Sequence, residues 1–176
     1  TDPIAFAVPL PAAAPIVIDV SLSKVARGKL MAAAQKGDAI PPDWAFDEEG
    51  LPTTDPAAGM RGTMAPLGDA KGVALALMVE LLCAGLTGAN YAFEQSSFFD
   101  AKGQPPGTGQ LLIALDPAAF GDDALARFAV MAEAVSNEPG ARLPGARRHA
   151  LREKLTREGI PLDAALVEDV RGIARR

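Results

Sequence analysis

The fold is decided by the stretch Met64-Ala-Pro-Leu-Gly-Asp-Ala-Lys-Gly-Val-Ala-Leu-Ala-Leu-Met-Val-Glu-Leu-Leu-Cys-Ala-Gly-Leu-Thr-Gly88. A Pro/Gly loop leads directly into a helix, and residues 73–86 of this helix contain a single charged side chain, Glu80. A helix that is apolar on all sides is normally buried on all sides, and this one is shorter than the roughly 20 apolar residues that span a bilayer. The stretch therefore predicts a buried central helix, ended by Gly88 as a left-handed cap.

The start of this helix is a candidate anion site. The first N–H groups of a helix have no partner within it, and they carry a partial positive charge that favours carboxylates and phosphates. Lys71 adds a full charge there, between Gly68 and Gly72. From the residues alone, a ligand contact by Lys71 and a solvated lysine have equal weight.

The composition excludes several classes of protein. Apolar residues make up 49% of the 176-residue chain and charged residues 22%, which excludes a disordered polypeptide. The net charge of −5 argues against nucleic acid or an anionic membrane as the partner. One cysteine and one histidine cannot form a zinc site, so no metal is expected. A lone cysteine, Cys83, fits a small core residue in a reducing, cytoplasmic compartment.

The order of elements predicts an α/β (α+β) fold. Apolar runs at residues 4–8 and 16–20 predict neighbouring strands covered by helices, and residues 110–116 (QLLIALD) predict the clearest strand of the chain. Helices are expected over residues 24–36 (capped by Ser21 or Ser23), from Asp122 or Asp123 to 137, and over 146–158 and 163–174, whereas residues 40–62 read as a loop anchored by Trp44. The strands are too few for a doubly wound sheet, and no Gly-x-Gly-x-x-Gly follows one. We expect two parts, residues 1–121 and 122–176.

Asp19 is a second candidate for a functional role. It interrupts the apolar run at 16–20, and a carboxylate within an apolar strand is costly unless it is paired or caps something. Such a buried carboxylate can orient a catalytic base or hold a hydroxyl group, although a structural role carries more weight.

Several long motifs resemble the malate/L-lactate dehydrogenase family of non-Rossmann oxidoreductases, which includes sulfolactate, ureidoglycolate and diketogulonate dehydrogenases and cyclic-imine reductases. The motifs are Thr1-Asp-Pro-Ile-Ala-Phe-Ala-Val-Pro9, Ile18-Asp-Val-Ser-Leu-Ser-Lys-Val-Ala-Arg-Gly28, Ile40-Pro-Pro-Asp-Trp-Ala-Phe-Asp-Glu-Glu-Gly-Leu-Pro-Thr-Thr-Asp-Pro56, Pro66-Leu-Gly-Asp-Ala-Lys-Gly72, Leu75-Ala-Leu-Met-Val-Glu-Leu-Leu82, Ser97-Phe-Phe-Asp100 and Arg142-Leu-Pro-Gly145. They occur in order over essentially the whole chain.

The resemblance implies hydride transfer between NAD or NADP and a 2-hydroxy/2-oxo acid by a cytoplasmic homodimer. It implies a non-Rossmann nucleotide-binding domain with a mixed sheet and buried central helix, here incomplete, followed by C-terminal helices of a helical domain. The cofactor-binding residues would be Ile18, Asp19, Val20, Ser21, Ala70, Lys71, Gly145 and Ala146, with Asp19 also catalytic through the acid–base group that it orients. Lys24 and Arg27 could meet the 2′-phosphate of NADP, although solvated positions carry as much weight.

Two departures from the family pattern qualify this expectation. The family's acid–base histidine lies in a Ser-His-Gly motif that would precede Thr1, and the usual Pro-Gly-Glu is Pro144-Gly145-Ala146 here. The chain therefore resembles the rear part of such an enzyme, and little turnover is expected from it alone. The alternatives are a truncated, non-catalytic module that keeps the fold for dimer assembly, and a cyclic-imine reductase of the same family.

Overall fold

The computed structural model describes residues 2–98 and 102–175, so parts of the motifs at Thr1 and at residues 97–100 lie outside the described residues. The described residues form two compact units. One unit contains residues 2–6 and 18–116, and the other contains residues 7–17 and 117–175. The cofactor residues suggested by the sequence are divided between these two units.

The core of the first unit lies between two helices, α1 (Arg27–Lys36) and α2 (Pro56–Arg61). Leu30, Ile40 and Ala45 are buried together, and partly buried hydrophobic side chains, including that of Trp44, pack against them. An added Cβ at Gly59 of α2 would lie 2.9 Å from the Cβ of Ala45, so the glycine allows this close packing. The prediction that Trp44 anchors its segment to the body of the domain is confirmed.

Residues 40–62 are mostly loop, as expected, but two regular elements interrupt them. The segment contains the short strand β3 (Ala45–Phe46) and helix α2, and β3 pairs antiparallel with β4 (Thr63–Met64). The many turn residues of this segment favoured a loop in the sequence, although Asp55 and Pro56 form the start of a helix. The helix expected over 24–36 also begins later, at Arg27, because Ser23 donates its hydroxyl to the carbonyl of Val25 instead of capping the helix. Its end at Gly37, with φ 73°, is as predicted.

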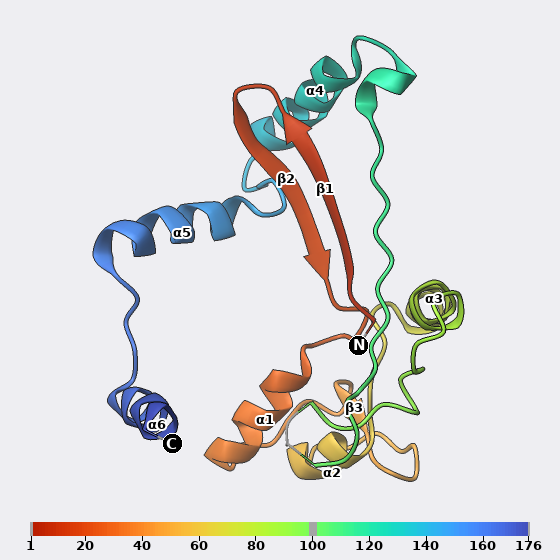
Figure 1. Cartoon of the computed structure of the whole chain (residues 1–176), viewed down its shortest axis with the longest axis vertical. Coiled ribbons are helices and arrows are strands. Elements are labelled where there is room, and N and C mark those ends of the chain that lie inside the picture. The colour runs from red at the N-terminus through yellow and green to blue at the C-terminus, as the bar shows by residue number, and fades with distance from the viewer. Residues whose placement is uncertain (1, 99–101, 176) are drawn as a thin grey trace. The chain divides into compact units, whose positions relative to one another are not determined.

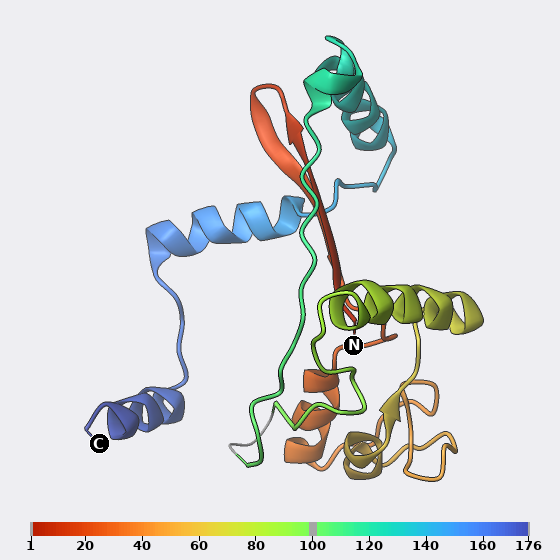
Figure 2. The same cartoon turned by 45° about the vertical axis from the view of Figure 1, so that its right-hand side comes forward.

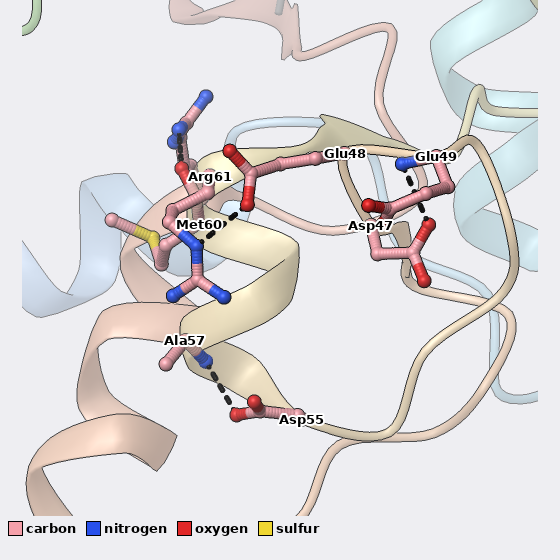
Figure 3. Close-up of polar contacts among 8 residues, drawn as sticks. Asp47, Glu48, Glu49, Asp55, Ala57, Met60 and Arg61 are labelled. Carbon is pink, nitrogen blue, oxygen red and sulfur yellow. Dashed lines mark hydrogen bonds and ion pairs between the residues drawn. The ribbon is translucent and has the colours of Figure 1, made fainter.

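The Asp55 side chain caps α2 by accepting a hydrogen bond of 2.8 Å from the N–H of Ala57 (Figure 3). Loss of a side-chain N-cap usually costs about 1 kcal/mol. We therefore expect Asp55→Ala to lower the free energy of unfolding by about that amount in urea titrations followed by Trp44 fluorescence, whereas Asp55→Asn, which keeps a capping oxygen, should change it by less than half as much. Equal losses in the two variants would contradict a capping role.

The apolar stretch forms α3 (Asp69–Glu80), which continues as a π turn over Leu81–Gly85. In this turn the N–H of Leu86 donates to the carbonyl of Leu81, five residues earlier, at 2.8 Å. Gly88 has φ 72°, the left-handed conformation expected after the helix. Both figures show the helix and its continuation (Figure 1, Figure 2).

The expectation that this helix is buried on every side is wrong. Within α3 only Gly72 and Val79 are buried, whereas Val73 and Leu77 are 54% and 58% exposed. A helix that is apolar all round needs a covering layer on each face. The described residues of this unit cover only the side that carries Gly72 and Val79.

Strands β1 (Ile4–Leu10) and β2 (Ala13–Val20) form a two-stranded sheet and run in opposite directions (Figure 1). The prediction of neighbouring strands is confirmed, and the turn between them narrows to Pro11 and Ala12, with Ala12 at φ 53°. Most of their residues are half-buried or exposed, so the expected cover of helices is absent from the described residues. The described chain forms two two-stranded sheets, this pair and β3–β4, and the expected mixed sheet does not form among them.

The prediction of a strand at Gln110–Asp116 is wrong. These residues are extended but join no sheet of the described chain, and Leu112 is 92% exposed (Figure 1). The composition of residues 110–116 favours an extended, half-buried backbone. A strand also needs a neighbouring strand with which to exchange hydrogen bonds.

The second unit carries the C-terminal helices α4 (Ala124–Asn137), α5 (Ala146–Glu158) and α6 (Ala164–Ala174), preceded by a 3₁₀ turn at Pro117–Phe120. All three helices are confirmed to within two residues. Asp163 caps α6 by accepting from the N–H of Ala165, whereas Asp123 precedes α4 without a side-chain cap. No helix in the described part of the chain has both the length and the apolarity to cross a membrane.

Candidate cofactor site

A short backbone ladder joins the end of β2 to the loop before α3. The N–H of Leu67 donates to the carbonyl of Leu22, and the N–H of Lys24 donates to the carbonyl of Ala65, both at 2.8 Å. Ser23 forms the antiparallel bridge with Pro66 between them. This ladder fixes the chain that follows residues 18–21 against the chain that precedes Ala70 and Lys71, so two of the three predicted cofactor segments belong to one framework.

The first turn of α3 begins with two consecutive left-handed residues, Gly68 at φ 68° and Asp69 at φ 52°. The turn is tight, because the N–H of Lys71 donates to the carbonyl of Gly68 at 3.2 Å and a Cβ at Gly72 would lie only 1.8 Å from the carbonyl oxygen of Leu67. Ala70 and Lys71 are exposed. No ion pair among residues 2–98 and 102–175 involves the Lys71 ammonium group, so it is available to an anion.

The structure places Ile18, Asp19 and Val20 at the exposed end of β2. Asp19 is therefore not the buried carboxylate that the apolar run suggested, because the strand that carries it has no helical layer over it in the described chain. Ser21 is half-buried, and its hydroxyl lies 2.5 Å from that of Ser23.

The remaining predicted residues, Gly145 and Ala146, begin α5 in the other unit. There the N–H of Val17 donates to the carbonyl of Pro144 at 3.3 Å. Gly145 has φ 86°, and an added Cβ would lie 3.2 Å from Val17, so both its backbone conformation and its close packing favour glycine. Within this unit, the turn is thus joined to Val17 of β2.

Two cavities in the first unit were not predicted from the sequence. The larger, of about 770 Å³, is lined mainly by apolar side chains such as Leu22, Leu77, Tyr91 and Phe93. The smaller, of about 660 Å³, is bordered by Ala70 of α3. Both also border Pro66 and Val73, so they flank the same part of α3. Their volumes fall within the usual range for small-molecule sites.

Lys24 and Asp43 form an ion pair at the smaller cavity, and both side chains remain about half exposed. The hydrogen bond from Lys24 lowers the pKa of Asp43 below its usual value of 3.8. Because the pKa of Asp43 is lowered, the ion pair stabilises the fold at and above the usual pKa of the carboxyl group. This stabilisation is lost as the pH falls through the lowered pKa. Asp43 is therefore ionised at neutral pH. Arg27, the other cation considered for a 2′-phosphate, donates to the carbonyl of Met60.

No group of three or more His, Cys, Asp or Glu side chains among the described residues is arranged to hold a metal ion.

The sequence profile of the malate/L-lactate dehydrogenase family matches residues 1–171. The (2R)-3-sulfolactate dehydrogenase (NADP(+)) of Chromohalobacter salexigens is 52% identical over 174 residues, which cover 99% of this chain and 52% of that protein. A Δ1-pyrroline-2-carboxylate reductase of Ancylobacter novellus is 38% identical over 180 residues, which cover 100% of this chain and 53% of the relative. The chain belongs to the malate/L-lactate dehydrogenase family, and it spans about half the length of the curated relatives that it matches.

Solved structures agree with this assignment. The Δ1-piperideine-2-carboxylate reductase of Pseudomonas syringae pvar. tomato superposes with a TM-score of 0.86 at 38% identity, over 97% of this chain and 52% of that one. The sulfolactate dehydrogenase of Methanocaldococcus jannaschii superposes with a TM-score of 0.78 at 30% identity, over 98% and 51% of the two chains. The recognition of the family from its motifs is therefore confirmed.

Proposed function

We propose that the protein is an NADP-dependent oxidoreductase that transfers a hydride between the nicotinamide and a 2-hydroxy/2-oxo acid. The observation that carries this proposal is the 52% identity, over nearly the whole chain, to a relative named as an NADP(+)-linked sulfolactate dehydrogenase. In this proposal residues 1–121 form part of the dinucleotide-binding domain, and residues 122–176 form the C-terminal helical segment.

The first turn of α3 fits the pyrophosphate of a dinucleotide. Its N-terminal N–H groups and the exposed Lys71 ammonium present positive charge, and Ala70 has no side chain beyond Cβ to block a close approach. Asp69 in the same turn places a negative charge nearby, so Lys71 is the group that makes this position attractive to an anion. The bound cofactor would supply or accept the hydride.

The other predicted residues receive roles that follow from their positions. Ile18, Asp19, Val20 and Ser21 would line the nicotinamide end, because the chain that follows them, Leu22 and Ser23, borders the larger cavity. Asp19 would orient the acid–base group from the exposed end of β2, and Gly145 and Ala146 would provide a close backbone approach.

The acid to test first is 3-sulfolactate, with its 2-oxo counterpart in the reverse direction. A second candidate substrate is a cyclic imine such as Δ1-pyrroline-2-carboxylate or Δ1-piperideine-2-carboxylate, because several relatives at 38–42% identity are named as reductases of these compounds. Rates of NADPH and NADH oxidation with a panel of 2-oxo acids and cyclic imines would separate the two. These assays use the intact, full-length enzyme, and its failure to turn over either class would favour the third possibility, a non-catalytic module.

We also propose that the enzyme is a cytoplasmic homodimer and that the 176-residue chain alone turns over substrate slowly or not at all. The only histidine of the chain is His149, and it lacks the Ser-His-Gly setting of the family's acid–base group. A general acid must lie within hydrogen-bond reach of the oxygen that it protonates. Substantial turnover by the isolated 176-residue chain would contradict this part of the proposal.

Lys71→Ala tests the cofactor site directly. Loss of one well-placed cation from a phosphate contact is expected to weaken binding of NADPH and NADH alike by about tenfold, or roughly 1.4 kcal/mol. Fluorescence titration of the reduced cofactors measures both affinities. Lys36→Ala, which removes an exposed cation from the end of α1, is the matched control and should leave both unchanged. Equal affinities in wild type and Lys71→Ala would remove Lys71 from the site.

A further inference from the structure

We propose that the smaller cavity beside α3 holds the adenosine end of the cofactor, and that Lys24, oriented by Asp43, distinguishes a 2′-phosphate from a 2′-hydroxyl there. This inference rests on the proposed cofactor function and extends it to the choice between NADP and NAD. It assigns a specificity role to an ion pair that has no part in the hydride transfer itself.

The position of the cavity is the first argument. Asp69, Ala70 and Val73 form its border along the first turn of α3, which is where the pyrophosphate would lie. A dinucleotide has a nucleoside on each side of its pyrophosphate, and two cavities flank α3 at Pro66 and Val73. If the larger cavity receives the nicotinamide end, the smaller one is left for the adenosine.

The lining of the cavity is the second argument. Pro42, Phe46, Pro52 and Pro66 present rigid, flat apolar surfaces, which suit a planar purine ring. These side chains come from the segment around β3 and from the loop before α3, and both are held in place by backbone pairing. The N–H of Ala65 donates to the carbonyl of Trp44 at 3.0 Å, and Phe46 bridges to Pro52.

The polar rim is the third argument. Lys24, Asp43 and Asp69 are the charged residues of the lining, and the ion pair between Lys24 and Asp43 holds the ammonium at the cavity. An ammonium has three donors, so Lys24 can bind a phosphate while it keeps Asp43. Asp43 is ionised at neutral pH, which orients Lys24 but also repels a phosphate. The pair therefore favours NADP through Lys24 and limits that preference through Asp43.

Fragments of the cofactor test this inference without any turnover. In the intact protein, adenosine 2′,5′-bisphosphate and 5′-AMP would each be titrated as competitors of bound NADPH, followed by its fluorescence. We expect Lys24→Met to weaken the bisphosphate by about tenfold and to change 5′-AMP by less than twofold, since only the first carries the 2′-phosphate. The Asp43→Asn variant should bind the bisphosphate at least as tightly as wild type, because it removes a repulsive charge and its amide oxygen can still accept the hydrogen bond that orients Lys24.

The matched control is a second exposed ion pair of this unit, in which Arg61 Nε donates to Glu48 Oε2 at 2.9 Å, and neither of these residues lines the two cavities (Figure 3). Arg61→Met should leave both fragments unchanged. The inference is overturned if Lys24→Met and wild type bind the bisphosphate equally well, or if Lys24→Met loses affinity for 5′-AMP to the same extent. A tenfold loss of bisphosphate affinity in Asp43→Asn would also overturn it. If NADPH binding still depends on Lys71, the proposed function survives that result. If wild type binds neither reduced cofactor, the proposed function itself fails.

Discussion

Gly72→Ala is expected to prevent the first unit from folding around the start of α3. The glycine is buried, and an added Cβ would lie 1.8 Å from the carbonyl oxygen of Leu67 and 2.7 Å from its carbonyl carbon. Both are backbone atoms, and Leu67 is fixed by the hydrogen bond from its N–H to Leu22. The clash cannot be relieved by a side-chain rotation, so the loop and helix must separate.

We expect this substitution to cost more than about 3 kcal/mol, which is above the usual range for single changes. Thermal and urea unfolding measured by circular dichroism provide the test. Gly28→Ala is the control, because Gly28 also lies in a helix but an added Cβ meets nothing within 4 Å. The control should gain about 0.5–1 kcal/mol from the better helix propensity of alanine. Equal stability in wild type and Gly72→Ala would show that the loop moves away at no cost.

Leu30→Ala is expected to have the second largest effect. Leu30 is fully buried between α1 and α2 and is the largest side chain of the core with no exposed surface. Truncation of a buried leucine costs about 2–5 kcal/mol, because apolar contact is lost and a cavity remains. Gly59 and Ala45, which pack at this position, have too little side chain to fill the space.

Urea titration followed by Trp44 fluorescence reports this loss locally, because Trp44 packs against the same core. Met31→Ala, one residue further along α1 and 38% exposed, is the matched control and should cost less than half as much. Similar losses in the two variants would mean that the cluster around Leu30 is not the core of this unit.

The C-terminal helices could be predicted from the sequence because residues at their ends mark where they begin and stop. Asp163 precedes α6 as a cap, and Gly145 and Gly159 bound α5, so the ends of these helices are marked by residues that act within one turn. The same holds for Gly37 after α1 and Gly88 after the α3 stretch. Such signals do not depend on what packs against the helix.

Burial could not be read in this way, because it depends on distant partners. Residues 110–116 have the composition of a strand, yet no described strand pairs with them. Asp19 was expected to be buried because its neighbours are apolar, but β2 presents it to solvent. An apolar composition indicates that a segment favours burial, but it does not identify the element that packs against it.

The candidate site was only partly predictable for a related reason. Lys71 stands out in the sequence because it lies at the start of an apolar helix beside glycines. The pairing of Lys24 with Asp43 joins residues nineteen positions apart, and no periodicity relates them. The bridge of Ser23 to Pro66 brings together segments still further apart. Contacts of this kind appear only when the chain has folded.

The π turn at Leu81–Gly85 changes how the longest apolar stretch can be used. A five-residue hydrogen-bonded step adds one residue to the helical repeat, which rotates all later side chains by roughly 100° relative to an unbroken α-helix. The apolar side chains that follow Leu81 consequently face in other directions than an unbroken continuation of α3 would give them. The C-terminal end of this helix can thus present exposed side chains such as Leu86 to a neighbour that an unbroken α-helix would not face.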